Sequence, residues 1–147
     1  MGIKLIGYIE NLHNEFLVHS DIRPQNILLD LKHDDEYSII NFGKCAKFEE
    51  FKNGSRRHYR NTPQTFIGDY WFSSPNMLAG QRPTRRDDII SIIYTMMYMA
   101  NKLPNLKALR SNEAIKEYKI KTSAKDFCWG MERFGPILQE AYSYEFT

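Results

Sequence analysis

The stretch from Ile89 to Met99 constrains this sequence most, because it is apolar around nearly the whole circumference of a helix. A helix that is apolar on all sides is stable only when other elements surround it. Two aspartates, Asp87 and Asp88, come just before this stretch, where negative charge favours the positive end of a helix dipole. The sequence therefore predicts a buried central helix around which the rest of the chain folds.

Shorter apolar patterns surround this central helix. Amphipathic helices are expected where apolar residues recur at helical spacing, at residues 3–15, 105–119 and 131–144. Strands are expected at the short apolar runs 16–18, 27–29 and 37–40. The polar residues 30–36 predict a hairpin turn, whereas residues 41–80 lack periodicity, which is typical of a functional loop or of disorder. The predicted fold is mainly α, with a small β-hairpin.

The composition excludes several classes of protein. With 147 residues, 42% of them hydrophobic and 26% charged, the chain has the size and balance of one globular domain. Its net charge of +2 is too balanced to indicate nucleic acid binding. Cys45 and Cys128 have no His partner at ligand spacing, so they indicate no metal site. The longest apolar stretch is too short to cross a membrane and no signal peptide is evident, so an intracellular protein of cytoplasm or nucleus is expected.

A polar segment before the predicted hairpin carries the sharpest motif. It reads His19-Ser20-Asp21-Ile22-Arg23-Pro24-Gln25-Asn26 and is followed by an apolar run. The segment resembles the catalytic loop of protein kinases, H-R-D-L-x-x-x-N, with His, Asp and Asn in register. The resemblance implies that Asp21 accepts or orients the proton of an attacking hydroxyl. It also implies that Asn26 places an amide oxygen on a metal ion.

A second motif follows at the spacing that kinases use. Asn41-Phe42-Gly43 comes fifteen residues after Asn26, after the last predicted strand. Protein kinases carry D-F-G at this place, and its Asp binds Mg²⁺. The resemblance therefore assigns Asn41 to the cofactor-binding and metal-binding position. Because its amide is neutral, we expect a weakened Mg²⁺ site.

The third motif is the longest and indicates a particular family. Gly68-Asp69-Tyr70-Trp71-Phe72-Ser73-Ser74-Pro75-Asn76 is followed by Arg85-Arg86-Asp87-Asp88. These residues resemble the casein kinase I family, which has G-T-A-R-Y-A-S-I-N and then S-R-R-D-D-L-E-S. The resemblance covers nearly the whole chain but only the C-terminal lobe of the family's domain. It implies an α+β protein-kinase-like C-terminal lobe whose hairpin lies next to the catalytic loop.

The resemblance also implies roles for further residues. Arg23 joins Asp21 as a catalytic residue, in the place of the family's Lys. His19 and Asp88 are expected to support the catalytic loop structurally. Gly68, Ser74 and Asn76 are expected to face the substrate. ATP and Mg²⁺ are the implied cofactors, and a protein substrate or protein partner is the implied ligand.

The sequence carries no Gly-rich loop and no V-A-I-K-type lysine before its first helix. Residues 1–147 are therefore expected to form a partial kinase domain without the N-terminal ATP-binding lobe. Three hypotheses stay open. The chain is part of a weakened Ser/Thr kinase that transfers the γ-phosphate of ATP once that lobe is present, or a pseudokinase fragment that binds a protein without chemistry, or a decayed product that folds poorly. Asn41 favours the last two over the first.

Overall fold

Helices make up most of the regular structure. The computed structural model describes residues 1–30, 32, 37–59 and 62–144. Its α-helices are α1 (Gly2–Asn14), α2 (Pro75–Leu78), α3 (Arg85–Met99), α4 (Asn112–Lys121), α5 (Ala124–Phe127) and α6 (Gly135–Ser143). Its strands are β1 (Leu17–Val18), β2 (Ile27–Leu29), β3 (Tyr37–Ile39), β4 (Ala46–Lys47), β5 (Glu49–Lys52) and β6 (Ser55–His58). The mainly α fold with small antiparallel sheets is the one that the sequence predicts.

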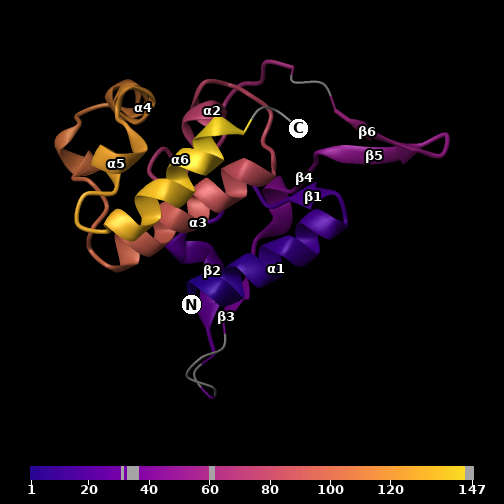
Figure 1. Ribbon diagram of the computed structural model, residues 1–147, viewed down its shortest axis with the longest axis horizontal. Coiled ribbons are helices and arrows are strands. Elements are labelled where there is room, and N and C mark those ends of the chain that lie inside the picture. Colours follow the sequence, from indigo (N-terminus) through magenta and orange to yellow (C-terminus); the bar gives the residue numbers. More distant parts are fainter. Residues whose placement is uncertain (31, 33–36, 60–61, 145–147) are drawn as a thin grey trace.

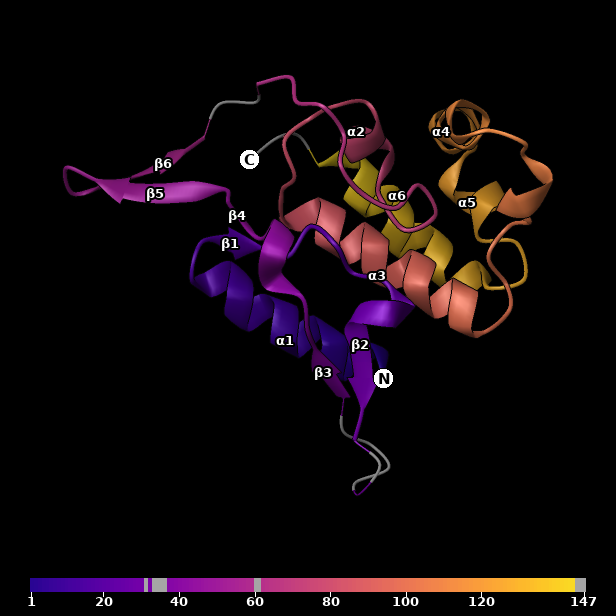
Figure 2. The same cartoon turned by 180° about the vertical axis from the view of Figure 1, so that it is seen from behind.

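Helix α3 is the central element that the apolar stretch predicts. It begins at a capping box, in which Thr84 and Asp87 satisfy each other's free backbone amides. One side of α3 packs against α5 and α6 in a cluster that includes Tyr94, Met97 and Leu138. The opposite side packs against α1 through Ile92, whose neighbours include Leu5. Figures 1 and 2 both show α3 running between α6 on one side and α1 on the other.

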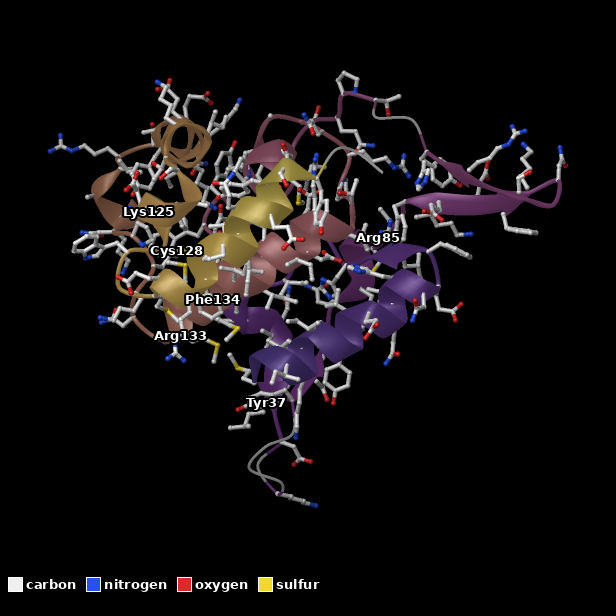
Figure 3. The ribbon with its side chains drawn as sticks, viewed as in Figure 1. Tyr37, Arg85, Lys125, Cys128, Arg133 and Phe134 are labelled. Carbon is white, nitrogen blue, oxygen red and sulfur yellow. The ribbon has the colours of Figure 1, made fainter. Side chains whose placement is uncertain are left out.

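The side-chain view separates these two packing regions. The labelled Cys128 and Phe134 lie beside α5 and α6, whereas Tyr37 lies on the other side of α3, next to α1 (Figure 3). Cys128 is buried in the first cluster, and Phe134 packs against that cluster. The core thus has two parts that share one helix.

Two of the small sheets flank the two segments that carry the first and second motifs. The predicted hairpin is confirmed, since β2 pairs antiparallel with β3 with Ile27 opposite Ile39. Most of its predicted turn at 30–36 lies outside the described residues. Strand β1 pairs with β4, which places Val18 opposite Ala46. The catalytic-loop segment runs from β1 to β2, and the Asn41-Phe42-Gly43 segment runs from β3 to β4, so the two pairings bring the segments together.

The structure differs from the sequence-based expectations in three places. The segment 41–80, expected to be aperiodic, contains a β5–β6 hairpin that projects from the helical body in both views (Figures 1 and 2). The helix expected at 105–119 begins only at Asn112, because Ser111 caps it and accepts from the Ala114 amide. The helix expected at 131–144 begins at Gly135, after a single 3₁₀ turn over Glu132–Phe134. None of the described helices has the length and apolar character that crossing a membrane requires.

Candidate functional site

The carboxylate of Asp88 holds the predicted catalytic loop in place. One of its oxygens accepts from the backbone N–H of His19 at 2.8 Å, and the other accepts from the backbone N–H of Ser20 at 2.9 Å. Ser20 has a φ of 65°, in the left-handed region, which costs energy for a residue other than glycine. Asp88 is 1% exposed, so these bonds lie away from water. The loop therefore depends on a buried carboxylate supplied by the first turn of α3.

His19 connects the loop to the Asn41-Phe42-Gly43 segment. Its ring is fully buried, with Nε2 3.1 Å from the Ile40 carbonyl oxygen and Nδ1 accepting from the Asp21 backbone N–H at 3.2 Å. These partners fit one tautomer, with the proton on Nε2. The ring also makes an edge contact with Phe42. Both ring nitrogens are thus occupied by backbone groups, which is consistent with the structural support predicted for His19.

Asp21 is a buried carboxylate with a cation near each oxygen. Its side chain is 3% exposed, and Lys44 Nζ lies 3.1 Å from Oδ2. Arg23 Nε lies 3.6 Å from Oδ1, and the same guanidinium reaches Asp69 at 3.4 Å through Nη1. The Lys44 contact is an ion pair without hydrogen-bond alignment, since Oδ2 has no hydrogen-bond partner in the described structure. Asp21 and Arg23 are therefore together, as the resemblance implies, but with Lys44 added.

The two asparagines at the implied metal positions bond to each other. Asn41 Nδ2 donates to Asn26 Oδ1 at 3.3 Å, and Asn26 Nδ2 donates to the Asp21 carbonyl at 2.7 Å. The side-chain oxygen of Asn26 that a metal would use thus accepts from Asn41. Asn41 has a φ of 69°, a left-handed conformation that Asn and Asp adopt more readily than other side chains. The backbone there suits Asp as well as Asn.

The donor set at this site does not fit Mg²⁺. Mg²⁺ binds through carboxylates and water in near-octahedral geometry, and it needs negative ligands to offset its charge. Here the Asp21 carboxylate is paired with cations, and the side-chain oxygen of Asn26 accepts from the amide nitrogen of Asn41. Among the described residues, no cluster of three or more His, Cys, Asp and Glu side chains could hold a metal ion. The Asp21 carboxylate is therefore not free to bind Mg²⁺.

The segment predicted to face the substrate is fixed to the start of α3. Ser74 is fully buried; its Oγ donates to Asp87 at 2.5 Å and accepts from the Met77 backbone N–H at 3.1 Å. Asn76 lies against Arg86, and its side-chain oxygen, turned toward the guanidinium, accepts from Nε at 3.2 Å. The backbone at Gly68 passes close to Phe66, leaving no room for a side chain. These contacts fix the backbone of the segment, and its substrate-facing role stays a prediction.

Burial raises the pKa of two groups near the catalytic loop and the start of α3. Burial raises the pKa of the Asp87 carboxyl above its ordinary value, and the hydrogen bond from Ser74 opposes part of that rise. Burial also raises the pKa of the Cys45 thiol, with the negative charge of Asp88 as a second cause. Cys45 therefore stays protonated at neutral pH and is a poor nucleophile.

Two lysines that contact the motif segments are not identified by the motifs themselves. Lys44 follows Asn41-Phe42-Gly43 directly, so its place beside a motif is a signal that the sequence does contain. Lys119 lies on α4, is 1% exposed, and donates to the carbonyls of Trp71 and Ser73 at 2.8 Å each. The sequence offers no signal for its burial, because a lysine on an amphipathic helix is expected in water. Lys44 contacts the catalytic-loop segment, and Lys119 binds the segment 68–76, so both lysines contact segments that the motifs identify.

Known proteins resemble this chain in sequence. The protein kinase domain family matches residues 3–135. One relative, the rice (Oryza sativa subsp. japonica) casein kinase 1-like protein HD16, is 28% identical over 102 residues, which are 67% of this chain and 14% of the relative. A second, described as a "probable casein kinase I homolog" of Encephalitozoon cuniculi, is 30% identical over 139 residues, which are 90% of this chain and 45% of the relative. The chain thus spans less than half the length of either relative. It belongs to the protein kinase domain family, as a casein kinase I-like member.

Proposed function

We propose that this chain is the C-terminal lobe of a casein kinase I-like Ser/Thr kinase domain that has lost Mg²⁺-dependent phosphoryl transfer, or retains it only weakly. The observation that carries the proposal is the bond between the two implied metal ligands, Asn41 Nδ2 to Asn26 Oδ1. Phosphoryl transfer in kinases requires metal ions to neutralise the charge that develops on the phosphates. A site without a free carboxylate for the metal lacks that means of neutralisation.

The retained loop geometry supports a second candidate, an active kinase in a protein that includes an ATP-binding lobe. Asp88 still holds the loop through two backbone amides, and Asn26 still bonds to the Asp21 carbonyl. These two contacts support a role for Asp21 as the general base of this candidate. The kinase domain family generally uses ATP and Mg²⁺ and acts on proteins, so the substrate of this candidate is a Ser or Thr side chain of a protein.

A third candidate, a non-catalytic module that binds a protein, is supported by exposed apolar side chains. Ile3 is 90% exposed, and Leu28, Leu29 and Phe42 are about half exposed. They belong to α1, to the β2–β3 hairpin and to the 3₁₀ turn after it. Exposed apolar patches are typical of surfaces that other proteins cover, and Leu28 and Leu29 are consecutive residues of β2. Loss of catalysis and retention of this surface are compatible in one protein.

The deciding experiment measures phosphate transfer by the full-length native protein. Purified protein is incubated with Mg²⁺ and γ-labelled ATP, with an acidic Ser-containing peptide as acceptor, beside its Asp21→Asn variant. We expect the wild-type protein to transfer no more label than the variant, because metal neutralisation is missing. Transfer by the wild type that is about a hundredfold above the Asp21→Asn variant would establish the active candidate instead.

A further inference from the structure

We propose that Lys44, together with Arg23, supplies positive charge to this site from within the chain, and that Lys44 thereby excludes a divalent cation from the Asp21 carboxylate. The inference rests on the proposed loss of the Mg²⁺ site and assigns a second residue to that loss. It makes the site one in which an ammonium group, and not a metal ion, compensates the buried carboxylate.

The placement of Lys44 carries the inference. Lys44 ends the 3₁₀ turn Phe42–Lys44, directly after Asn41, and its Nζ lies 3.1 Å from Asp21 Oδ2. The Asp21 side chain is 3% exposed, whereas that of Lys44 is 34% exposed, so the lysine approaches a buried carboxylate from the open side of the site. An ion reaching Oδ2 from the solvent would have to displace this ammonium group.

The charges around Asp21 are already balanced. Asp21 and Asp69 contribute two negative charges, and Arg23 and Lys44 contribute two positive charges within 3.6 Å of them. The amides of Asn26 and Asn41 add none. A divalent cation would therefore enter a site without net charge, where an ammonium group at close range repels it. The neutral amide oxygens that would replace its water ligands do not offset this repulsion.

Asn41 and Lys44 change the site in the same direction. The amide of Asn41 removes a negative charge at one implied metal position, and Lys44 adds a positive charge three residues later. Restoring only one of the two leaves the site short of negative charge. Since the left-handed backbone at Asn41 suits Asp, an Asn41→Asp change does not strain the chain. The inference therefore predicts that the two changes act together on cation binding.

The test measures binding of Mn²⁺, a paramagnetic substitute for Mg²⁺, by electron paramagnetic resonance of the free ion. Wild-type protein is compared with Asn41→Asp, with Lys44→Met and with the double variant. Lys47→Met serves as the matched control, because it removes an exposed lysine on β4. We expect the double variant to bind Mn²⁺ about tenfold or more tightly than either single variant. The Lys47→Met protein should match the wild type, and adding Asp21→Asn to the double variant should abolish its binding.

The outcomes separate this inference from the proposed function. If Asn41→Asp alone binds as tightly as the double variant, Lys44 does not exclude the cation, although the loss of the metal ligand still stands. If the double variant binds no better than the single ones, the inference is also wrong. Wild-type protein that binds Mn²⁺ as tightly as the double variant would overturn the proposed function itself. Lys44→Gln, which is polar and of similar length, replaces Lys44→Met if far-ultraviolet circular dichroism shows that the Met variant is unfolded.

Discussion

The buried carboxylate of Asp88 has three partners. It accepts from two backbone amides of the catalytic loop, and it contacts His13 Nε2 at 3.0 Å. An Asp88→Asn variant keeps one oxygen acceptor but turns an NH₂ group toward one of the donors. Hydrogen bonds to a charged acceptor contribute about 1.5–3 kcal/mol each, and at least one is lost. We expect Asp88→Asn to reduce the free energy of unfolding by about 2 kcal/mol, measured by urea denaturation.

A matched control for this prediction is Glu113→Gln on α4. Glu113 is exposed and contacts Lys116 at 3.5 Å, so its charge contributes little to stability. We expect this control to change stability by less than about 0.5 kcal/mol. An Asp88→Asn variant as stable as the control would show that the loop conformation does not depend on the carboxylate.

Sequence motifs predict which residues of the catalytic loop lie close together. The spacing of His19, Asp21 and Asn26 predicts one loop, and the structure joins these residues through the Asp21 backbone, which bonds to the other two side chains. The contact of Lys44 with Asp21 joins residues that are distant in sequence, and it depends on how β1 pairs with β4. A motif states which residues occupy a loop, but the partners that cross from another segment are set by tertiary packing.

At the scale of elements, helix α4 is fixed to the segment before α2 by one buried lysine. Lys119 Nζ donates to the carbonyls of Trp71 and Ser73 and lies 4.2 Å from the centre of the Tyr94 ring. Burial lowers the pKa of Lys119 well below its ordinary value of 10.5, while Asp69 opposes that effect. Between the lowered pKa and 10.5, the folded protein binds fewer protons than the unfolded chain, so stability rises with pH across that window.

This linkage leads to a prediction for Lys119→Met. The variant leaves two buried carbonyls unpaired, each at a cost of about 1–3 kcal/mol, but it removes the cost of burying a charge. We expect the stability lost by Lys119→Met, measured by urea denaturation, to be larger near pH 9 than near pH 7. Subtracting variant from wild type at each pH cancels other titrating groups. Lys121→Met on the same helix, where the lysine is 74% exposed, should show no such trend.

Elements also differ in how well the sequence predicts them. Helix α1 follows from periodic apolar spacing, α3 follows from a long apolar run, and the β2–β3 hairpin follows from two short apolar runs across a polar turn. The β5–β6 hairpin lacks this alternation, and its signal is the turn. Asn53 and Gly54 both have positive φ, at 53° and 77°, as expected of a two-residue hairpin turn. Polar strands around an Asn-Gly pair are therefore missed when only hydrophobic periodicity is considered.

At the scale of the whole molecule, α3 joins two clusters of buried side chains. Ile90, Ile93 and Tyr94 belong to the cluster with α5 and α6, whereas Ile92 belongs to the cluster with α1. Ile89 packs against both. Because each cluster needs α3 to be helical, loss of either one exposes apolar surface of the helix that supports the other. The molecule should therefore unfold as one cooperative unit, which the hypothesis of a poorly folding product does not predict.

Leu5→Ala on α1 tests this coupling. Leu5 is fully buried in the α1 cluster, and its truncation should reduce the free energy of unfolding by about 2–5 kcal/mol. Trp71 packs against the other cluster, so the fluorescence of the tryptophans reports on that side of α3. If α3 couples the two sides, Leu5→Ala lowers the urea midpoint equally in fluorescence and in far-ultraviolet circular dichroism.

Ile3→Ala on the same helix is the control, since Ile3 is 90% exposed and its loss should leave both midpoints unchanged. A fluorescence midpoint that stays at the wild-type value while circular dichroism changes would mean that the α1 side unfolds independently. In that case the catalytic loop, whose Ile22 is buried in the α1 cluster, would lose its packing together with α1 although Asp88 ties it to α3.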